Sequence, residues 1–446
     1  MRFLHELNYL IRTNYINELL ENRGKNVVIA GWVENVKELP NLRFIIVRDR
    51  TGLSQVTVHK KDSAPELVSL SEKLNLQDVI AVEGTVPERQ IAKIGPEIKP
   101  ISITVLNKSE TPLPIDISGV SQTLLDSRLD WRVLDLRNPR NLAIMKVEAK
   151  LMEAMEEYLR SDGFIQVSTP AILGGASEGG SEVFKIDYFG NKAFLRQDPQ
   201  LHRQLAIAGG LDKIYDLGPS WRAEMSHTPR HLCEHHACAV EFGFLKDELD
   251  TERVEEALMA YSLGKVVEDC KTELELLGAK REKPQTPFPE VRFPEVYDIL
   301  KEYGKVVPFG EEPDREGEAI LAKHVKEKTK SDFFFMNRFP FNVKPFYVAR
   351  VDEDPQWARS VDMIYRGMEL SSGGQREHRY SKLMEQVKIK GLNEKELSWF
   401  TDNFKYGVPP HGGFAVGIER TVMQMLGVEN IREVCLFPRT PERLRP

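Results

Sequence analysis

The 446-residue sequence has few cysteines, no long apolar run and no excess of positive charge. Four cysteines provide no framework of disulfides, which agrees with a reducing compartment. No segment approaches the ~18 apolar residues that a membrane-spanning helix needs, and the N-terminal stretch contains no signal-peptide cleavage site. We therefore expect a cytoplasmic protein with no membrane segment.

The net charge of −7 gives no sign of a general affinity for nucleic acid. It does not exclude such binding, because binding depends on where basic groups cluster rather than on their sum. Hydrophobic residues at 41% and charged residues at 29% are typical of a globular protein. A chain of this length exceeds one ordinary core, so we expect two or three domains.

A series of short β-rich runs follows a helical lead-in at residues 1–24. The runs span residues 27–33, 44–48, 54–59, 79–86 and 101–107, with turn residues between them. Five strands in about 85 residues predict an OB-fold barrel, which binds single-stranded nucleic acid on one face. Without further information, Phe44 in the second run is equally well explained as a core residue.

The proline-rich segment at residues 110–114 marks the expected domain boundary. We expect the barrel over residues 1–108, a charged hinge over 109–140 and a larger domain over 141–446. The larger domain contains a small insertion at about residues 283–342, to which the sequence assigns no chemistry. It opens with an amphipathic helix whose apolar positions are Ile144, Val147, Leu151, Met155 and Tyr158.

The functional interpretation depends on residues 215–244, which predict two strands joined by a polar loop. Arg222, His227, Arg230 and His231 lie within ten positions of one another. Guanidinium groups suit phosphate, so this density of basic groups favours a polyphosphate site. Taken alone, the stretch is better explained as a solvated surface hairpin.

Two later segments favour a ligand site over a surface hairpin. Residues 412–420 predict a glycine-rich strand leading into an apolar helix, with Arg420 at the junction, where it can stack on a flat ligand. Residues 360–372 contain Asp362, Glu369 and Ser372, oxygen donors of the kind that Mg²⁺ takes, although such a strand is more often a solvated face. Together, the helix with its strand, the basic hairpin and the glycine-rich strand resemble the three signature motifs of class II aminoacyl-tRNA synthetases.

The resemblance is most specific at residues 372–378, Ser-Gly-Gly-Gln-Arg-Glu-His, a signature of the archaeal and eukaryotic aspartyl branch. It implies an α+β fold: an N-terminal OB-fold barrel and a class II catalytic domain, whose antiparallel sheet is flanked by helices. It implies a ligase that uses ATP and Mg²⁺ to form aspartyl-adenylate and then charges tRNA-Asp. Whether tRNA-Asn is charged as well stays open, and a homodimer is implied by the resemblance only.

The resemblance also assigns roles to single positions. Arg222 and Arg420 are the catalytic candidates, the first on the α-phosphate and the second over adenine. The other candidates for binding ATP are Glu224, Arg230, His231, His235 and Glu369. The metal candidates are Glu369, Ser372 and Asp362. The candidates for binding the amino acid are Glu178, Asp198, Gln200, Arg203, Ser372 and Arg376. The barrel positions matching Phe44, Gln55 and Glu83 contact the central uracil of the anticodon in the family.

Three positions depart from the pattern of the aspartyl family. Asp198 and Arg203 replace a serine and a lysine, and Ala239 replaces an aspartate two residues before Glu241. We interpret this as a relocation: Asp198 restores the lost carboxylate, and Arg203 serves as a cation for the substrate side chain. The alternative is that the pocket has changed its substrate.

Other functions remain open. An asparaginyl enzyme is the near rival, although a neutral amide would leave a buried cation unpaired where Arg203 lies beside Arg376. A related ligase that forms asparagine would have no use for an anticodon-reading barrel. A non-catalytic RNA-binding protein would not need the four residues Arg222, Glu369, Ser372 and Arg420.

A zinc site is the last alternative, because histidine and cysteine crowd residues 231–238. Alternation along the predicted strand argues against it, since His236 and Cys238 would face away from His235.

Overall fold

The computed structural model describes residues 11–121, 123–175, 183–225 and 228–446. Its contacts divide the chain into two compact units, Met1–Pro114 and Ile115–Pro446, which we describe separately. Each unit has its own hydrophobic core. The boundaries expected for the hinge and the insertion stay predictions. No described helix is long and apolar enough to cross a membrane.

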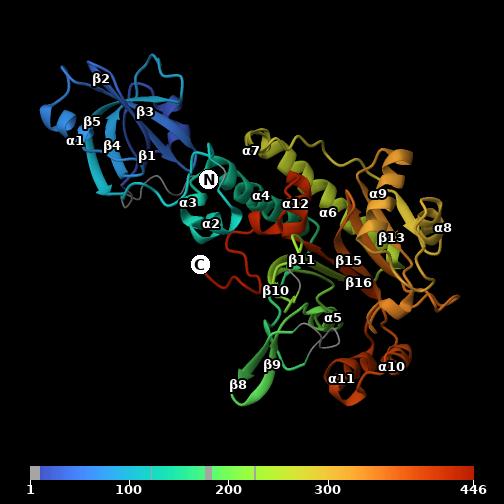
Figure 1. Ribbon diagram of the computed structural model, residues 1–446. Coiled ribbons are helices and arrows are strands. Elements are labelled where there is room, and N and C mark those ends of the chain that lie inside the picture. The colour runs from blue at the N-terminus through green and yellow to red at the C-terminus, as the bar shows by residue number, and fades with distance from the viewer. Residues whose placement is uncertain (1–10, 122, 176–182, 226–227) are drawn as a thin grey trace. The chain divides into compact units, whose positions relative to one another are not determined.

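The first unit is a closed five-stranded barrel with the strand order β1-β2-β3-β5-β4, drawn in blue and cyan in Figure 1. Its strands are β1 (Asn26–Glu38), β2 (Leu42–Asp49), β3 (Gly52–His59), β4 (Val79–Thr85) and β5 (Glu97–Asn107), with η1 (Ile16–Asn22) before them and α1 (Pro65–Glu72) after β3. Alternate strand residues fill the core, among them Ile29, Val47, Val56, Val82 and Ile98. The predicted OB-fold barrel is confirmed.

Gly31 lets β1 approach β2 closely. A Cβ atom there would lie 2.2 Å from the carbonyl oxygen of Arg48, a backbone atom that cannot move aside. Glycine is therefore required at this position by packing, independently of its conformational freedom.

The second unit is built on an eight-stranded sheet of order β12-β13-β14-β15-β16-β11-β10-β6. The strands are β6 (Ile165–Gln166), β10 (Lys213–Trp221), β11 (Glu234–Gly243), β12 (Glu290–Arg292), β13 (Phe333–Asn337), β14 (Ser360–Tyr365), β15 (Met368–Arg376) and β16 (His411–Gly417). The sheet is antiparallel through its centre, as predicted. At its two edges, however, the pairs β6–β10 and β12–β13 are parallel.

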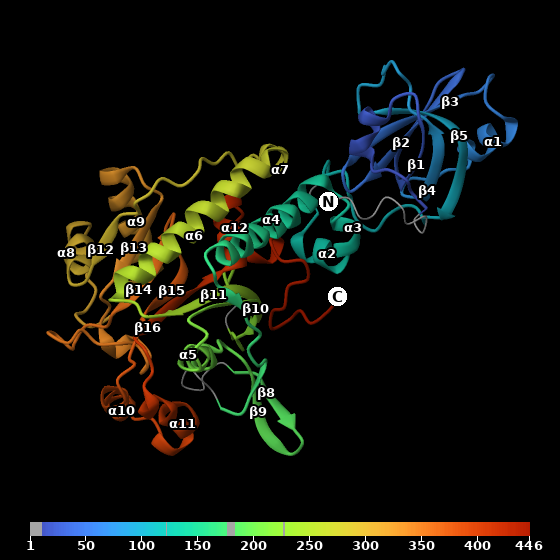
Figure 2. The same ribbon diagram turned by 180° about the vertical axis from the view of Figure 1, so that it is seen from behind.

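Two long helices, α4 (Pro139–Ser161) and α6 (Glu248–Asp269), run side by side across one face of this sheet, as Figure 2 shows. The predicted apolar stripe of α4 is buried there, with Val147, Leu151 and Met155 fully enclosed. The short helix α12 (Ile418–Leu426) packs against α4. These helices seal one face and leave the other face of the sheet for ligands.

The remaining elements are a small three-stranded sheet and the shorter helices. The hairpin sheet contains β7 (Ile172–Leu173), β8 (Lys185–Tyr188) and β9 (Asn191–Leu195). The other helices are α2 (Leu125–Asp130), α3 (Arg132–Asp135), α5 (Gln200–Ala208), α7 (Lys271–Leu277), α8 (Glu295–Glu302), α9 (Arg315–Thr329), α10 (Tyr380–Ile389) and α11 (Glu394–Thr401), with short 3-10 turns η2 (Phe341–Val343), η3 (Asp402–Tyr406) and η4 (Ile431–Glu433).

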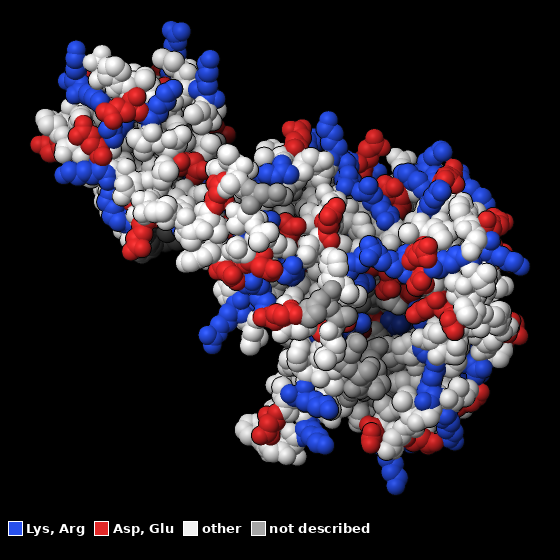
Figure 3. All heavy atoms as spheres, in the orientation of Figure 1, with Lys and Arg blue, Asp and Glu red and all other residues white. Residues whose placement is uncertain are grey.

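Charges of both signs are interspersed on the face of the second unit that Figure 3 shows. Lys and Arg side chains do not form a continuous surface of one sign there, in keeping with the net charge of −7. Attraction of this face to a polyanion would therefore depend on local groups rather than on a general field.

Arg132 ties α3 to a distant segment near the C-terminus. Its side chain is 1% exposed, and Nη1 lies 2.6 Å from Oδ2 of Asp135. The same guanidinium donates to three carbonyl oxygens, those of Glu433, Cys435 and Leu436, at 2.7 to 3.0 Å. One buried side chain thus satisfies a carboxylate and a run of backbone acceptors.

We expect Arg132→Ala to lower the free energy of unfolding of the second unit by about 3–5 kcal/mol, because it leaves buried acceptors without a donor. Arg253→Ala is the matched control. Arg253 forms an exposed pair with Asp250 and should contribute less than about 1 kcal/mol. Urea denaturation of both variants checks this, and equal losses would contradict the structural role of Arg132.

Candidate active site

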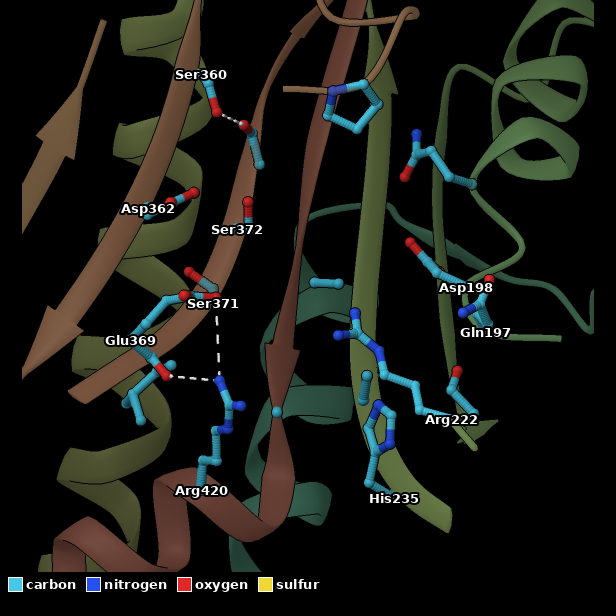
Figure 4. A pocket seen from close by; sticks show the side chains of 18 of the residues that line it. Gln197, Asp198, Arg222, His235, Ser360, Asp362, Glu369, Ser371, Ser372 and Arg420 are labelled. Carbon is cyan, nitrogen blue, oxygen red and sulfur yellow. Dashed lines mark hydrogen bonds and ion pairs between the residues drawn. The ribbon is translucent and has the colours of Figure 1, made fainter. Parts of the chain in front are cut away.

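A cavity of about 640 Å³ lies over β10, β11, β14, β15 and β16 (Figure 4). It brings together residues that the sequence singled out in segments far apart along the chain. The predicted residues that line it are Asp198, Gln200, Arg222, Glu224, Arg230, His231, His235, Asp362, Glu369, Ser372, Arg376 and Arg420. Arg203 is buried behind the wall, and Glu178 lies outside the described residues. The roles expected for them stay predictions.

Strand register explains why distant residues meet on one face. Asp362 on β14 pairs with Ser372 on β15, Ser372 pairs with Ala415 on β16, and Ala415 pairs with Ala239 on β11. Directly paired residues point to the same side of a sheet, so these four residues form one row on the cavity face. A carboxylate at position 239 would therefore point toward the cavity.

A β-bulge adds Glu369 to the same face. Glu369 and Ser372 are three residues apart and would face opposite sides of a regular strand. The pairing shifts between Met363 and Ile364, so that Leu370 is an extra residue on β15. This bulge turns Glu369 toward the side of Ser372 and Asp362.

The acidic end of the cavity has the donor set of a hard cation. Oδ1 of Asp362 is buried and has no hydrogen-bond partner among the residues that the structure describes, while Glu369 and Ser372 lie nearby (Figure 4). Burial and then the neighbouring Asp362 raise the pKa of Glu369. An orphaned carboxylate oxygen beside a second carboxylate and a hydroxyl fits Mg²⁺. Within the described ranges, no three acidic, histidine or cysteine side chains converge on one point, so phosphate and water would supply the other ligands.

Arg420 and His235 lie on facing sides of the cavity (Figure 4). Arg420 donates from Nη1 to the carbonyl oxygen of Glu369 at 3.3 Å, which holds its guanidinium over the sheet. Burial, aided by Arg222 and Arg420, lowers the pKa of His235 to about 4. His235 is therefore neutral at physiological pH and offers a flat, uncharged ring.

The neighbouring histidine and cysteine have other surroundings. Nδ1 of His236 lies 3.0 Å from Oε1 of Glu419 on α12, and Cys238 is fully buried in the core beneath the sheet. His235 lines the cavity on the opposite side of the same strand. The alternation expected for this strand is thus observed.

The opposite end of the cavity contains two ion pairs, one fully buried between Arg376 and Glu241 and one between the buried Arg203 and the partly exposed Asp198. Nη1 of Arg203 lies 2.7 Å from Oδ1 of Asp198, and Nη2 donates to Oδ2 of Asp198 at 2.8 Å. Nε of Arg376 donates to Oε1 of Glu241 at 3.0 Å. Gln200 joins the pairs, since it accepts from Arg203 at 2.7 Å and donates to Glu241 at 2.9 Å.

This arrangement determines which charges face a ligand. Arg203 is only 1% exposed and does not line the cavity, so Asp198 is the member of this pair that faces a ligand. Burial alone would raise the pKa of Asp198, but Arg203, Arg376 and Arg222 lower it, so the carboxylate is ionised. Among the described residues, Nη1 of Arg376 has no acceptor and is the nitrogen left for a ligand.

The anticodon candidates lie on the barrel's outer surface. Phe44 is half-buried and alternates with the core residue Ile45, so it is not part of the core cluster. It pairs with Thr57, whose hydroxyl accepts from Nε2 of Gln55 at 3.2 Å. Glu83 is exposed and accepts from Ser102 at 3.2 Å. An aromatic ring and an amide thus share one outer face of the barrel.

Lys344 also lines the acidic end, although no motif in the sequence singled it out. Burial alone would lower the pKa of Lys344, but Asp362 and Glu312 raise it. One signal was available: a single lysine within the apolar run from Phe339 to Val348 must have a buried partner.

Models of two known protein families match this chain. The model of the tRNA synthetases class II (D, K and N) matches residues 125–441, and that of the OB-fold nucleic acid binding domain matches residues 27–106. The chain belongs to the class II tRNA synthetases. The predicted family is thereby confirmed, and with it membership of a family of aminoacyl-tRNA ligases.

Archaeal relatives align with this synthetase over almost its full length. It is 45% identical to the aspartate–tRNA(Asp) ligase of Pyrococcus furiosus, over 98% of this chain and 100% of that protein. It is 38% identical to the aspartate–tRNA(Asp/Asn) ligase of Aeropyrum pernix, over 98% and 100% of the two chains. The crystal structure of the asparaginyl-tRNA synthetase from Pyrococcus horikoshii complexed with asparaginyl-adenylate is similar, with a TM-score of 0.89, 34% identity and coverage of 97% of this chain and 99% of that one.

The relocated carboxylate can be tested by moving it back. We expect Asp198→Ser to weaken binding of the substrate ammonium group by about 2–5 kcal/mol, because one partner of a buried charge pair is lost. Adding Ala239→Asp should recover much of that loss, since position 239 faces the cavity. Isothermal titration with aspartate measures both effects.

A melting curve of each variant separates binding from folding, because Asp198→Ser also leaves Arg203 unpaired. If the losses of binding free energy from the two substitutions simply add, or if Asp198→Ser leaves aspartate binding unchanged, the proposed relocation of the carboxylate is wrong.

Proposed function

We propose that this synthetase is an aspartate–tRNA ligase. It activates L-aspartate with ATP, releasing pyrophosphate, and transfers the aspartyl group of the adenylate to the 3′ end of tRNA-Asp. The observation that carries the proposal is the buried guanidinium of Arg376, which Glu241 orients and which keeps Nη1 for the substrate. Full-length identity to archaeal enzymes named for aspartate supports it.

The choice of aspartate over asparagine follows from hydrogen-bond chemistry. A side-chain carboxylate accepts from a guanidinium with either oxygen, whereas an amide presents an NH₂ group as well. An amide can turn its oxygen toward Nη1 of Arg376, but it lacks the negative charge of a carboxylate, so its hydrogen bond to the guanidinium is weaker. This difference favours aspartate over asparagine.

In the first step, an oxygen of the aspartate α-carboxylate attacks the α-phosphorus of ATP. The bond from that phosphorus to the bridging oxygen breaks, and pyrophosphate leaves. Arg222 projects into the middle of the cavity, between the amino-acid end and the acidic end (Figure 4). Its fixed positive charge stabilises the negative charge that develops on the α-phosphate oxygens.

The adenine binds between Arg420 and the neutral ring of His235, and Glu224 accepts from its amino group. Arg230 and His231 bind the outer phosphates. Glu369, Ser372 and Asp362 would hold Mg²⁺, which when bound neutralises charge on the phosphate oxygens. In the second step, a hydroxyl of the terminal ribose of the tRNA attacks the carbonyl carbon of the adenylate, and AMP leaves.

The barrel reads the anticodon through Phe44, Gln55 and Glu83. The protein acts in the cytoplasm and as a homodimer, as its family does. The edge strand β6 supports the dimer, since Ile165 on it is 50% exposed and the strand has an unpaired side. A second candidate activity is charging of tRNA-Asn with aspartate. Relatives from Aeropyrum pernix and Methanopyrus kandleri are named for both tRNAs.

ATP–pyrophosphate exchange with each amino acid tests the activation step. We expect aspartate to be the best substrate, and we expect Arg420→Ala, Arg222→Ala and Glu369→Ala each to cost at least ~2 kcal/mol of transition-state stabilisation. Better exchange with asparagine, or unchanged exchange in Arg420→Ala, would refute the proposal. Charging of tRNA-Asp and tRNA-Asn, measured separately, then decides between the two tRNA specificities.

Phe44→Ala tests the barrel independently of the catalytic unit. Loss of stacking should weaken the binding free energy for tRNA by ~1–3 kcal/mol, while pyrophosphate exchange with aspartate stays normal. Filter binding measures the first quantity and pyrophosphate release the second. Leu39→Ala, an exposed apolar residue of the barrel, is the control and should change neither. An equal loss of tRNA binding and activation in Phe44→Ala would mean that Phe44 serves folding.

A further inference from the structure

Lys344 is a buried cation in the acidic end of the cavity, and no step of the proposed reaction uses it. It follows the turn η2 and is 9% exposed. Its Nζ lies 2.9 Å from Oδ2 of Asp362 and 3.6 Å from Oε2 of Glu312. The ammonium also lies 3.6 Å from the ring centroid of Phe339, a cation–π contact that fixes it from another side.

The two oxygens of Asp362 therefore have different surroundings. Lys344 holds Oδ2, whereas Oδ1 is buried and finds no partner in the described part of the chain. Because Asp362 pairs with Ser372 across the strands, Oδ1 belongs to the row of donors that would meet a divalent ion. Lys344 thus orients the carboxylate and at the same time neutralises it.

The ammonium and a divalent ion would share one carboxylate. Like charges so close together repel, and the partly buried setting strengthens the repulsion. Without a nucleotide, the carboxylates at this end include those of Asp362, Glu369 and the half-exposed Glu312. Nη1 of Arg420 lies 4.0 Å from Oε1 of Glu369, whereas Lys344 is the cation that offsets Asp362. The triphosphate of ATP adds several negative charges and shifts the balance toward the metal.

We propose that Lys344 is a built-in cation that keeps the metal site weak until the phosphates of the nucleotide arrive. The ion then enters together with ATP, and the empty cavity does not collect divalent cations from solution. Lys344 is a positioning residue, because it acts on the ion through Asp362. This inference rests on the proposed use of ATP and Mg²⁺, and it assigns the order in which charge enters the site.

A purely structural role for Lys344 makes a different prediction, and Lys390 provides the matched control. Nζ of Lys390 donates to the carbonyl oxygens of Phe341 and Asn342, at 2.8 and 2.9 Å, and therefore fastens the same turn η2. Among the described residues, no carboxylate pairs with Lys390. Lys390→Met loosens the turn without changing the charge beside Asp362.

The test measures Mn²⁺ binding to the full-length protein by electron paramagnetic resonance, without nucleotide. We expect Lys344→Met to raise the affinity for Mn²⁺ about tenfold, whereas Lys390→Met and Lys344→Arg leave it within about twofold of the wild type. In an Asp362→Asn background, the effect of Lys344→Met should vanish, because the two residues act as one unit. Melting curves are recorded in parallel, and Lys344→Gln replaces Lys344→Met if the latter does not fold.

A second titration with a non-hydrolysable ATP analogue separates the two proposals. We expect the wild type to bind Mn²⁺ at least tenfold more tightly with the analogue than without it. No binding of Mn²⁺ even with the analogue would refute the proposed metal site itself. Normal binding with the analogue, but equal or weaker affinity of Lys344→Met than of the wild type without it, would overturn only the role of Lys344.

Discussion

The cavity depends on charged side chains that are matched in pairs with little exposure to water. Arg376 pairs with Glu241 and Arg203 with the partly exposed Asp198 at one end, and Lys344 pairs with Asp362 at the other. Removing a charge from water is costly, and each pair is tolerated because its partner and neighbouring hydrogen bonds compensate. The pairs therefore fix the positions of the donors and acceptors that face the ligand, before any ligand is present.

Much of this could be predicted from the sequence. The period of the short β-rich runs predicted the barrel, and the apolar spacing in residues 144–158 predicted the long helix against the sheet. The basic hairpin, the acidic strand and the glycine-rich strand pointed to the family and to twelve of the residues that line the cavity. These features are local, because each depends on residue types at short spacing.

What the sequence could not reveal depends on register between distant strands. The bulge at Leu370 decides that Glu369 and Ser372 share a face, and no local pattern announces it. The pairing of Arg203 with Asp198 likewise needs the turn of α5, which brings position 203 behind position 198 instead of into the cavity. Lys344 was missed because its partner Asp362 lies 18 residues further along the chain, on β14. The parallel edge pairs were missed because they join strands that are distant in the sequence.

The contacts of Arg132 also bear on the order in which the two units form during synthesis. All strands of the barrel lie within the first 107 residues, so the barrel can close while the ribosome is still making the second unit. Arg132, by contrast, binds carbonyl groups up to 304 residues further along the chain. Until those residues have emerged, α3 lacks its acceptors, and the second unit cannot finish folding. A nascent chain would therefore hold a complete barrel while its second unit is still unfolded in part, and exposed apolar surface in that unit would be open to aggregation.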